Sequence, residues 1–233
     1  MIYYDFHIHS ALSPCGDNDM TPNNIVNMAA IIGLDAIAIS DHNSVGNVRS
    51  AMKVGEQAGV KVLAGMEVET AEEIHILTLY KTIEAAEEAA KEVYRALPDI
   101  KNRTEIFGNQ YYIDEDDNIV GEEEKLLISP TTLSTDKLLD VVKSVGGIYI
   151  PAHVDRHSYS ILTNLGFIPE ELNIDGIEIS KKVDDVGLYL ESRKELKKYP
   201  LIRNSDAHYL TDIAEKDAYL TEESIEDFFN RRQ

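Results

Sequence analysis

Residues 4–10 have the sequence YDFHIHS, the end of a short apolar run that carries His7 and His9. Such a run is typical of a β-strand, and residues two apart on a strand point to the same side. The His-x-His spacing therefore lets two imidazoles bind one metal ion, at roughly 2.0–2.1 Å each for zinc. We predict a strand over Ile2–Phe6 that ends in a metal-binding pair.

The same arrangement recurs along the chain, because short apolar runs alternate with longer amphipathic stretches. We expect strands at Ile2–Phe6, Ala36–Ser40, Val60–Ala64, Ile74–Leu79, Gly147–Ile150, Gly176–Ile179 and Leu201–Asn204. We expect helices at Pro22–Ile32, Ser44–Ala58, Ile83–Leu97, Ser134–Val145, Asp184–Lys198 and Thr221–Arg232. Thr21 is suited to cap the first helix, and Pro22 to begin it. The alternation predicts an α/β fold, and it favours a (β/α) barrel over an open doubly wound sheet.

The length of 233 residues suits one barrel-type domain, and a hydrophobic content of 43% is enough for a folded core. One segment, at about 102–129, breaks the alternation. It contains FGNQYYIDEDDNIVGEEEKLLI, which predicts a β-hairpin turning around Asp116–Asn118. Within it, Asp114–Glu124 holds seven acidic residues and no basic one. We interpret it as a solvated insertion in a single domain of residues 1–233; the alternative is a lid or partner-binding loop beside the site.

The histidines are concentrated where the predicted strands end. Six of the seven lie at or near strand ends: His7, His9, His42, His75, His153 and His208. One such histidine is usually a packing residue, but six are hard to explain in that way. In a barrel, the carboxyl ends of the strands meet on one face, where catalytic residues gather. Carboxylates accompany the histidines at Glu67, Asp206 and Asp17, and this mixture suits zinc, manganese or iron better than magnesium.

Five separated blocks carry a family resemblance. They are YDFHIHS, ISDHN, GMEVET, IPAHV and NSDAH, and in this order they resemble the polymerase and histidinol phosphatase (PHP) superfamily. The resemblance extends from Tyr4 to His208. It implies a distorted (β/α)7 TIM-like barrel with a metal-dependent phosphoesterase site that holds two or three divalent ions. Such ions suit phosphate ester hydrolysis because they acidify water and neutralise phosphate oxygens.

Carried over block by block, the resemblance implies three groups of metal ligands. His7, His9, Glu67 and Asp206 would hold one ion, and Glu67 would bridge to a second ion completed by His75 and His153. His42 and His208 would hold a third ion with a residue of the first loop. Many relatives have HSxxSDG there, whereas this chain has HSALSPCGDND, so Asp17 is the first choice, Asp19 the second and Cys15 the third. We expect Glu67, Asp206 and His208 to serve in catalysis.

The charge of the chain bears on its partners. Lys and Arg number 22 and Asp and Glu 42, a formal net charge of −20. Because such a surface repels long polyanions, we expect a small phosphorylated substrate and no stable binding of duplex nucleic acid. Arg156, Arg203 and Lys181 lie near strand ends and are candidates to bind the substrate phosphate. Nothing in the sequence identifies a protein partner.

Three other polar residues are considered for roles around the site. Asp41 is expected to orient a neighbouring metal ligand. Glu178 either lines the pocket or is a structural carboxylate of its strand. His157 is either a proton donor or, as we favour, a histidine of a surface loop.

Several classes of protein are excluded or kept as alternatives. A single cysteine, Cys15, permits neither an intrachain disulfide nor a cysteine-based zinc finger. The N-terminus lacks a positively charged start, and no run approaches the roughly 20 apolar residues of a membrane span. We therefore expect a soluble, cytoplasmic protein that does not bind a membrane. Two alternatives are an amidohydrolase-type metal hydrolase, which generally has a lysine bridge where Glu67 stands here, and a noncatalytic metal-binding module.

Overall fold

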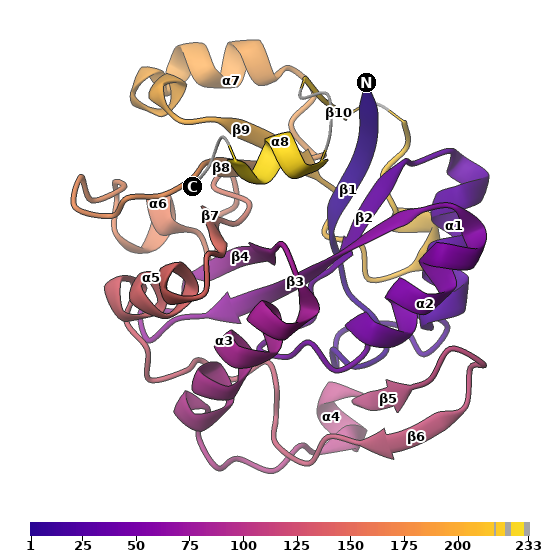
Figure 1. Cartoon of the computed structure of the whole chain (residues 1–233). Helices are drawn as coiled ribbons and strands as arrows, with labels where there is room; N and C mark the ends of the chain where they lie inside the picture. The colour runs from indigo at the N-terminus through magenta and orange to yellow at the C-terminus, as the bar shows by residue number, and fades with distance from the viewer. Residues whose placement is uncertain (217, 222–224, 231–233) are drawn as a thin grey trace.

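The computed structural model describes residues 1–216, 218–221 and 225–230. Its main feature is a curled sheet that forms a distorted barrel (Figure 1). The barrel strands are β1 (Ile2–Ile8), β2 (Ala36–Ile39), β3 (Lys61–Glu69), β4 (His75–Tyr80), β7 (Ile148–Pro151), β8 (Ile177–Ser180) and β9 (Leu201–Asn204). Each overlaps one of the predicted strands, so the prediction of a distorted (β/α)7 TIM-like barrel is confirmed.

The direction of β4 departs from a regular barrel. Strands β1, β2 and β3 are parallel neighbours, but β4 runs antiparallel to both β3 and β7. Strands β8 and β9 form a separate parallel pair. Backbone hydrogen bonds link this pair and the residues beside it to the rest. Val154 donates to the carbonyl of Glu178 at 2.9 Å, and Ala207 bridges the other side, where His9 donates to the carbonyl of Ala207 at 2.9 Å and Ala207 to that of His7 at 3.2 Å. An unpredicted strand, β10 (Tyr219–Leu220), pairs antiparallel with β1.

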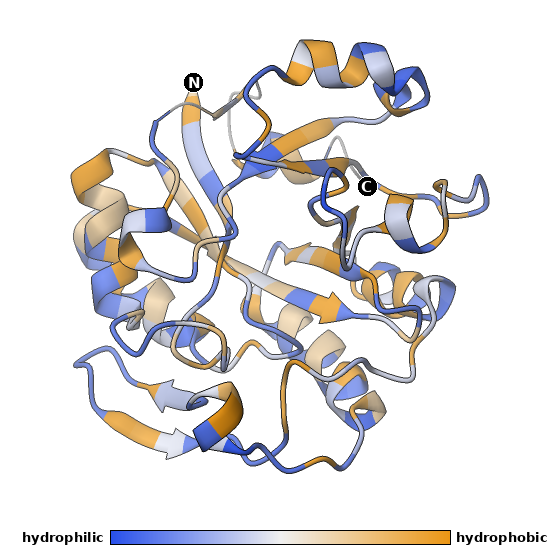
Figure 2. Cartoon of the chain, turned by 180° about the vertical axis from the view of Figure 1, so that it is seen from behind, coloured by the Kyte–Doolittle hydropathy of each residue, from blue (hydrophilic) through white to orange (hydrophobic). Residues whose placement is uncertain are grey.

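Two hydrophobic layers hold the barrel together. Alternate strand residues, among them Phe6, Ala38, Leu63 and Leu77, pack in the interior with Phe228 of α8 (Ile225–Asn230). The opposite strand faces pack beneath the surrounding helices, and Figure 2 shows the hydrophobic residues that colour the central strands. The alternation fails in β1, where the pairing with β2 shifts register between Asp5 and Ile8. This irregularity lets Phe6 fill the interior while its neighbour His7 also faces the barrel centre.

The helices cover the outer face of the sheet (Figure 1). They include α1 (Pro22–Ile32), α2 (Val48–Ala58), α3 (Ile83–Ala96), α5 (Thr135–Ser144) and α7 (Val186–Ser192). The predicted first helix is confirmed at both ends: the Thr21 hydroxyl accepts the N–H of Asn24 at 3.2 Å, and Gly33 ends the helix at φ 87°. A left-handed residue of this kind favours glycine because no Cβ is present to clash.

Some element boundaries differ from the prediction. The helix expected from Ser44 begins only at Val48, and the one expected over Asp184–Lys198 is divided into α7 and the 3₁₀ helix η1 (Lys194–Lys198). Short elements α4 (Thr104–Phe107), α6 (Ile161–Asn164) and η2 (Leu210–Asp212) were not predicted. Of the last predicted helix, residues 222–224 and 231–232 lie outside the described residues. No helix within the described ranges has the length and apolar character needed to cross a bilayer.

The predicted hairpin is present in the insertion. It consists of β5 (Tyr111–Ile113) and β6 (Ile119–Glu122), which lie near the end of the molecule toward which β1 runs (Figure 1). The turn is stabilised by the Asp114 carboxylate, which accepts backbone N–H groups of Asp116 at 3.0 Å and Asn118 at 2.9 Å. Such side-chain bonds to nearby backbone explain why Asp and Asn favour turns.

Candidate metal centre

The predicted ligands meet at one end of the barrel. His9 and His42 follow β1 and β2, and His153 follows β7, as expected for carboxyl ends of strands. His75, in contrast, is the first residue of β4. Because β4 runs antiparallel to its neighbours, its beginning lies beside their ends, and His75 reaches the same place.

Glu67 lies at the centre of this group and is 1% exposed. Its Oε1 faces three imidazole nitrogens: His75 Nδ1 at 3.0 Å, His7 Nε2 at 3.2 Å and His153 Nε2 at 3.2 Å. Its Oε2 faces His42 Nδ1 at 3.2 Å and His9 Nε2 at 3.4 Å. The two oxygens of one carboxylate thus face two different sets of imidazoles, which is the arrangement that a bridging ligand requires.

Among the described residues, potential ligand atoms gather in three groups, in each of which all of them lie within 4.8 Å of one another. The groups are His7, His9, Glu67 and Asp206; then His42, Glu67 and His75; and then His9, Cys15, His42 and His208. The first matches the first predicted ion site. The other two differ from the prediction in detail, because His42 joins Glu67 and His75, and because Cys15 enters the third group.

The residues present fit divalent metal ions. His7 Nε2 and His42 Nδ1 are buried and have no hydrogen-bond partner, although both point at Glu67. Leaving a buried polar atom unpaired costs about 1–3 kcal/mol, so unpaired nitrogens that converge on a carboxylate fit a site that binds a cation. A mixture of imidazoles, carboxylates and a thiol is a donor set for transition metals.

Polar residues behind the ligands orient two of the imidazoles. Glu178 accepts from His7 Nδ1 at 2.9 Å and from the backbone N–H of His153 at 2.8 Å. Its structural role is therefore to hold His7 with Nε2 toward Glu67. Asp41 acts on His9 through Ser13, whose hydroxyl donates to Asp41 at 2.7 Å and accepts from His9 Nδ1 at 3.0 Å. Such hydrogen bonds determine which imidazole nitrogen is free to bind a metal.

Two ligands sit on strained backbone. His153 has φ 31° and Asp206 has φ 54°, a region that residues other than glycine seldom adopt, although His, Asp and Asn are the most frequent among them. The cost is of order 1–3 kcal/mol for each residue, and surrounding bonds must hold it in place. Asp5 supplies such bonds next to Asp206, because its buried carboxylate accepts the backbone N–H of Ser205 at 3.1 Å and that of Ala214 at 2.9 Å.

The charges of the cluster compensate one another. Burial alone would raise the pKa of Glu67, but the imidazoles of His75, His7 and His42 hold that pKa well below its usual range. Burial, with repulsion from His9, lowers the pKa of His208 to about 4. His208 is therefore neutral near pH 7, the form in which imidazole binds a metal.

The ligands open onto a cavity of about 300 Å³. Arg156 lines it and pairs with Asp206, Nη1 to Oδ2, at 2.5 Å. Tyr159 lies at its edge with its ring stacked on His75, centroid to centroid 4.6 Å. Sequence reasoning missed Tyr159 and also Ile128, which reaches the cavity from the insertion. No local pattern marks either residue.

Four predicted site residues belong neither to the ligand groups nor to the cavity lining, whereas His7 and His9 belong to the ligand groups but do not line the cavity. Among the described residues that line it, Asp17, Arg203, Lys181 and His157 are absent. The Asp17 carboxylate accepts the N–H of Asp19 at 2.9 Å within its own loop. Arg203 donates to the backbone carbonyls of Lys181 at 3.0 Å and Val183 at 2.9 Å, and the Lys181 ammonium donates to the carbonyl of Asp212. These cations hold loops together, and His157 is exposed, as we favoured.

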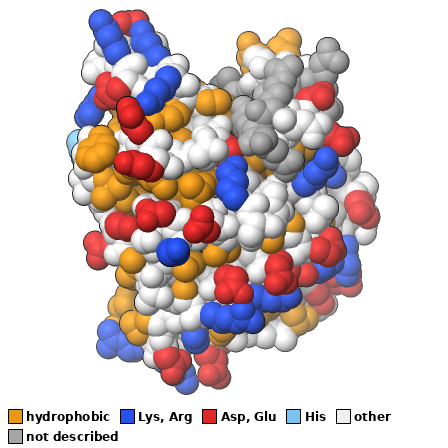
Figure 3. Space-filling model, turned by 60° about the vertical axis from the view of Figure 1, so that its left-hand side comes forward, with side chains coloured by type: hydrophobic (Ala, Val, Ile, Leu, Met, Phe, Trp, Pro, Cys, Tyr) orange, Lys and Arg blue, Asp and Glu red, His pale blue; other side chains and the backbone are white. Residues whose placement is uncertain are grey.

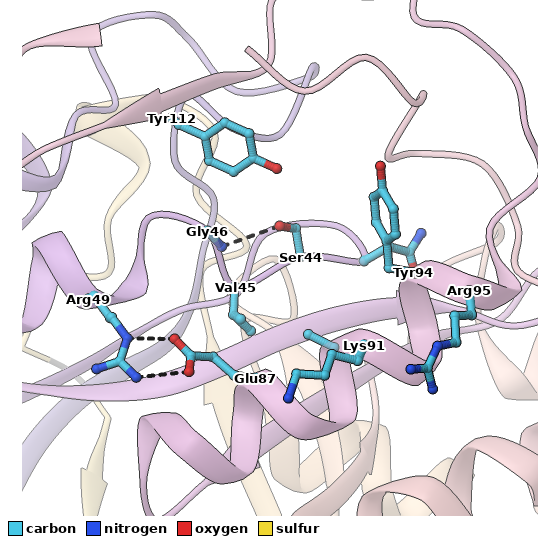
Figure 4. Close-up of a pocket in the computed structure, with 11 residues that line it drawn as sticks. Ser44, Val45, Gly46, Arg49, Glu87, Lys91, Tyr94, Arg95 and Tyr112 are labelled. Carbon is cyan, nitrogen blue, oxygen red and sulfur yellow. Dashed lines mark hydrogen bonds and ion pairs between the residues drawn. The ribbon is translucent and has the colours of Figure 1, made fainter. Parts of the chain in front are cut away.

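A larger cavity, of about 510 Å³, lies between the loop after β2, helix α3 and the hairpin (Figure 4). Tyr94 and Tyr112 form part of its wall, and Arg49 is paired with Glu87 through two bonds of 2.5 and 2.8 Å. It contains none of the predicted site residues among those described. The cluster of potential metal ligands around Glu67 therefore remains the candidate site.

Comparisons with known proteins agree with the geometry. The model of the PHP domain family matches residues 5–160. A phosphoribosyl 1,2-cyclic phosphate 1,2-diphosphodiesterase from Eggerthella lenta is 32% identical over 80 residues, which are 32% of this chain and 29% of that protein. A 5′-3′ exoribonuclease from Haemophilus influenzae is 30% identical over 79 residues, 33% of this chain and 28% of that protein. The chain thus matches less than a third of the length of each of these two relatives.

Solved structures share the fold. The lesion-specific endonuclease PfuEndoQ from Pyrococcus furiosus has a TM-score of 0.68 at 18% identity, over 98% of this chain and 55% of that one. An Endonuclease Q complex with a 27-mer duplex substrate has a TM-score of 0.59 at 18% identity, over 89% of this chain and 49% of that one. At this identity the likeness shows the fold alone.

The second of these structures corrects an expectation. We expected the net charge of −20 to exclude duplex nucleic acid, and this is wrong, because a protein with the same fold is complexed with a duplex. Net charge sums over the whole surface, whereas screening limits each charge to about 8–10 Å at physiological salt. On the face seen in Figure 3, acidic and basic side chains are interspersed, so the sum does not describe any one surface.

Proposed function

The chain belongs to the PHP domain family, and on this premise we propose that it is a metal-dependent phosphoesterase. Its substrates would be phosphate esters of nucleotides or oligonucleotides, or small phosphomonoesters. The observation that carries the proposal is the position of Glu67, whose two oxygens face two sets of imidazoles 3.0–3.4 Å away. The relatives named as a cyclic phosphodiesterase and an exoribonuclease support this class of substrate.

The proposed centre holds two or three divalent ions. The metal ions would be zinc, manganese or iron. The first ion would be held by His7, His9, Glu67 and Asp206, and the second by Glu67, His75 and His153. His42 and His208 would hold the third. We assign the first-loop position to Cys15 in place of Asp17, because only the cysteine lies with His9, His42 and His208. When bound, such ions polarise the phosphoryl group and lower the pKa of water.

Residues of the chain orient the metal ligands and place a positive charge at the wall of the cavity. The bond from His208 Nδ1 to the backbone oxygen of Asp206, at 2.9 Å, leaves Nε2 of His208 unprotonated when the ring is neutral. Arg156 adds a fixed positive charge at the cavity wall, where it is placed to bind a phosphate oxygen. The cavity of about 300 Å³ is small enough to enclose a phosphoryl group and one attached residue, which limits water around the reacting ester.

The test is hydrolysis by metal-loaded protein. Purified protein would be stripped with a chelator and reloaded with Mn²⁺, Zn²⁺ or Fe²⁺. It would then be assayed on an aryl phosphate, a bis-aryl phosphate, mononucleotides, and single- and double-stranded oligonucleotides. We expect metal-dependent cleavage of at least one phosphate ester, and its loss in Glu67→Gln.

Two results would contradict the proposal. A protein loaded with two or more ions that cleaves no phosphate ester would be a noncatalytic metal-binding module. A loaded protein that hydrolyses cyclic amides and no phosphate ester would be an amidohydrolase-type enzyme.

A further inference from the structure

We infer that Asn47 is a positioning residue, through which the acidic hairpin controls the orientation of the metal ligand His9. The inference rests on the metal centre of the proposed function and extends it to the insertion. The observation behind it is an unbroken chain of buried hydrogen bonds that leads from β5 to the imidazole of His9.

Asn47 connects to the hairpin on both edges of its amide. Its Oδ1 accepts the backbone N–H of Ile113 at 2.9 Å, and its Nδ2 donates to the backbone carbonyl of Tyr111 at 3.0 Å. Asn47 stands at the N-cap of α2, where an Asn side chain normally binds the helix, yet it makes no capping bond. The side chain therefore serves the hairpin in place of its own helix.

The second hydrogen of the Asn47 amide leads toward the metal centre. Nδ2 also donates to the hydroxyl of Ser10 at 2.9 Å, and Ser10 donates to Asp41 Oδ2 at 2.7 Å. Asp41 Oδ1 accepts the hydroxyl of Ser13 at 2.7 Å, and Ser13 accepts from His9 Nδ1 at 3.0 Å. All five side chains have 0% relative exposure, so no water competes for these bonds.

The donors and acceptors along the chain permit one arrangement. Ser10 donates its single hydroxyl hydrogen to Asp41, and its lone pairs accept from Asn47 and from the N–H of Leu12 at 3.2 Å. Ser13 likewise donates to Asp41 and accepts from His9 and from the N–H of His42 at 3.1 Å. Because a hydroxyl has one hydrogen and two lone pairs, neither serine has a free position. His9 must carry a proton on Nδ1, which leaves Nε2 to face Glu67 and Asp206.

The hairpin is held in place so that this link can persist. The N–H of Tyr111 donates to the carbonyl of Ala11 in the first loop at 2.9 Å. The Tyr112 ring lies against Gly46, where an added Cβ would come within 2.3 Å of it (Figure 4). The acidic sequence of the segment favoured a purely solvated insertion, but the segment also completes the hydrogen bonds that lead to the ligand His9.

The experiment measures metal affinity in the full-length protein by competition of Zn²⁺ with a chelator. The variants are Asn47→Ala, the isosteric Asn47→Asp, and Ser10→Ala, which keeps the hairpin bonds of Asn47 but cuts the link to Asp41. Tyr112→Phe is the matched control, since it removes the 2.5 Å bond to Glu123 within the insertion and leaves the link intact. Circular dichroism verifies folding of each variant.

We expect Asn47→Ala and Ser10→Ala each to weaken zinc binding roughly 10- to 100-fold, and Tyr112→Phe to leave it unchanged. The double variant that combines Asn47→Ala with Ser10→Ala should lose no more zinc affinity than Ser10→Ala alone, because both substitutions interrupt the same series of hydrogen bonds. Two results would overturn the inference. The first is unchanged zinc affinity in Ser10→Ala together with unchanged affinity in a folded Asn47 variant, either Asn47→Ala or Asn47→Asp. The second is a double variant whose fold-loss of affinity is the product of the two single losses. If Asn47→Ala does not fold, Asn47→Asp and Ser10→Ala decide. A wild-type protein that binds no zinc, manganese or iron would instead overturn the proposed function, and the inference with it.

Discussion

Replacing Glu178 with Gln is expected to weaken metal binding at the His7 site by 10- to 100-fold. Glu178 is 1% exposed and belongs to none of the ligand groups, yet its carboxylate accepts from three donors, and its two oxygens share the single Nδ1–H of His7. Its Oε1 accepts from His7 Nδ1 at 2.9 Å and from Asn204 Nδ2 at 2.6 Å. Its Oε2 accepts from the N–H of His153 at 2.8 Å and from His7 Nδ1 at 3.1 Å.

Glutamine cannot reproduce this pattern because one of its two terminal atoms is a donor. If its NH₂ takes the place of Oε2, it meets the backbone N–H of His153. If the NH₂ takes the place of Oε1, it meets His7 Nδ1, and His7 restores the bond only by moving its proton to Nε2. That nitrogen faces Glu67 at 3.2 Å, so the proton would occupy the position of the ion. Loss of such an orienting bond typically costs 10- to 100-fold in metal affinity, or about 1.4–2.8 kcal/mol.

The assay is chelator competition for zinc in folded protein, with Asp175→Asn as the matched control. Asp175 is also a carboxylate with little exposed surface, which accepts the N–H of Tyr149 at 2.7 Å and pairs with Lys143 at 2.6 Å, away from the ligands. We expect Asp175→Asn to lower the melting temperature and to leave zinc affinity unchanged. An unaltered affinity in Glu178→Gln, or an equal loss in the control, would refute the reasoning.

Three further results are expected. By elemental analysis, wild-type protein should hold at least two transition-metal equivalents and Glu67→Gln no more than one, since one carboxylate serves two groups of ligands; equal content would show that Glu67 does not bridge. In cobalt-loaded protein, Cys15→Ser should remove the near-ultraviolet thiolate-to-metal absorption while Asp17→Asn keeps it, and a spectrum that depends on neither residue would remove Cys15 from the centre. In steady-state kinetics, Arg156→Ala should raise KM for a phosphate ester roughly tenfold or more, the cost of one charge-assisted bond, whereas an unchanged KM would exclude it from substrate binding.

Local sequence was sufficient for the barrel strands and for most of the candidate ligands. Helix Pro22–Ile32 was predicted with the bounds that it has, and its start was marked by Thr21 and Pro22, which act within one turn of each other. The strands were recognised because burial on both faces produces short apolar runs. The ligand blocks were recognised by their resemblance to the PHP superfamily, and the position of six histidines at or near strand ends independently predicted that they meet on one face.

The tertiary structure alone decided how these pieces meet. No local pattern reveals that β4 runs antiparallel to β3, and yet this direction brings His75 beside Glu67. Our proposal of Cys15 in place of Asp17 depends on how the first loop folds against His208, and the position of the Arg203 side chain depends on carbonyls about 20 residues away. Net charge misled us about duplex substrates for the same reason: composition is a sum over the whole chain. Binding, coordination and hydrogen bonding depend on distances of a few ångströms between residues far apart in sequence, and only folding sets those distances.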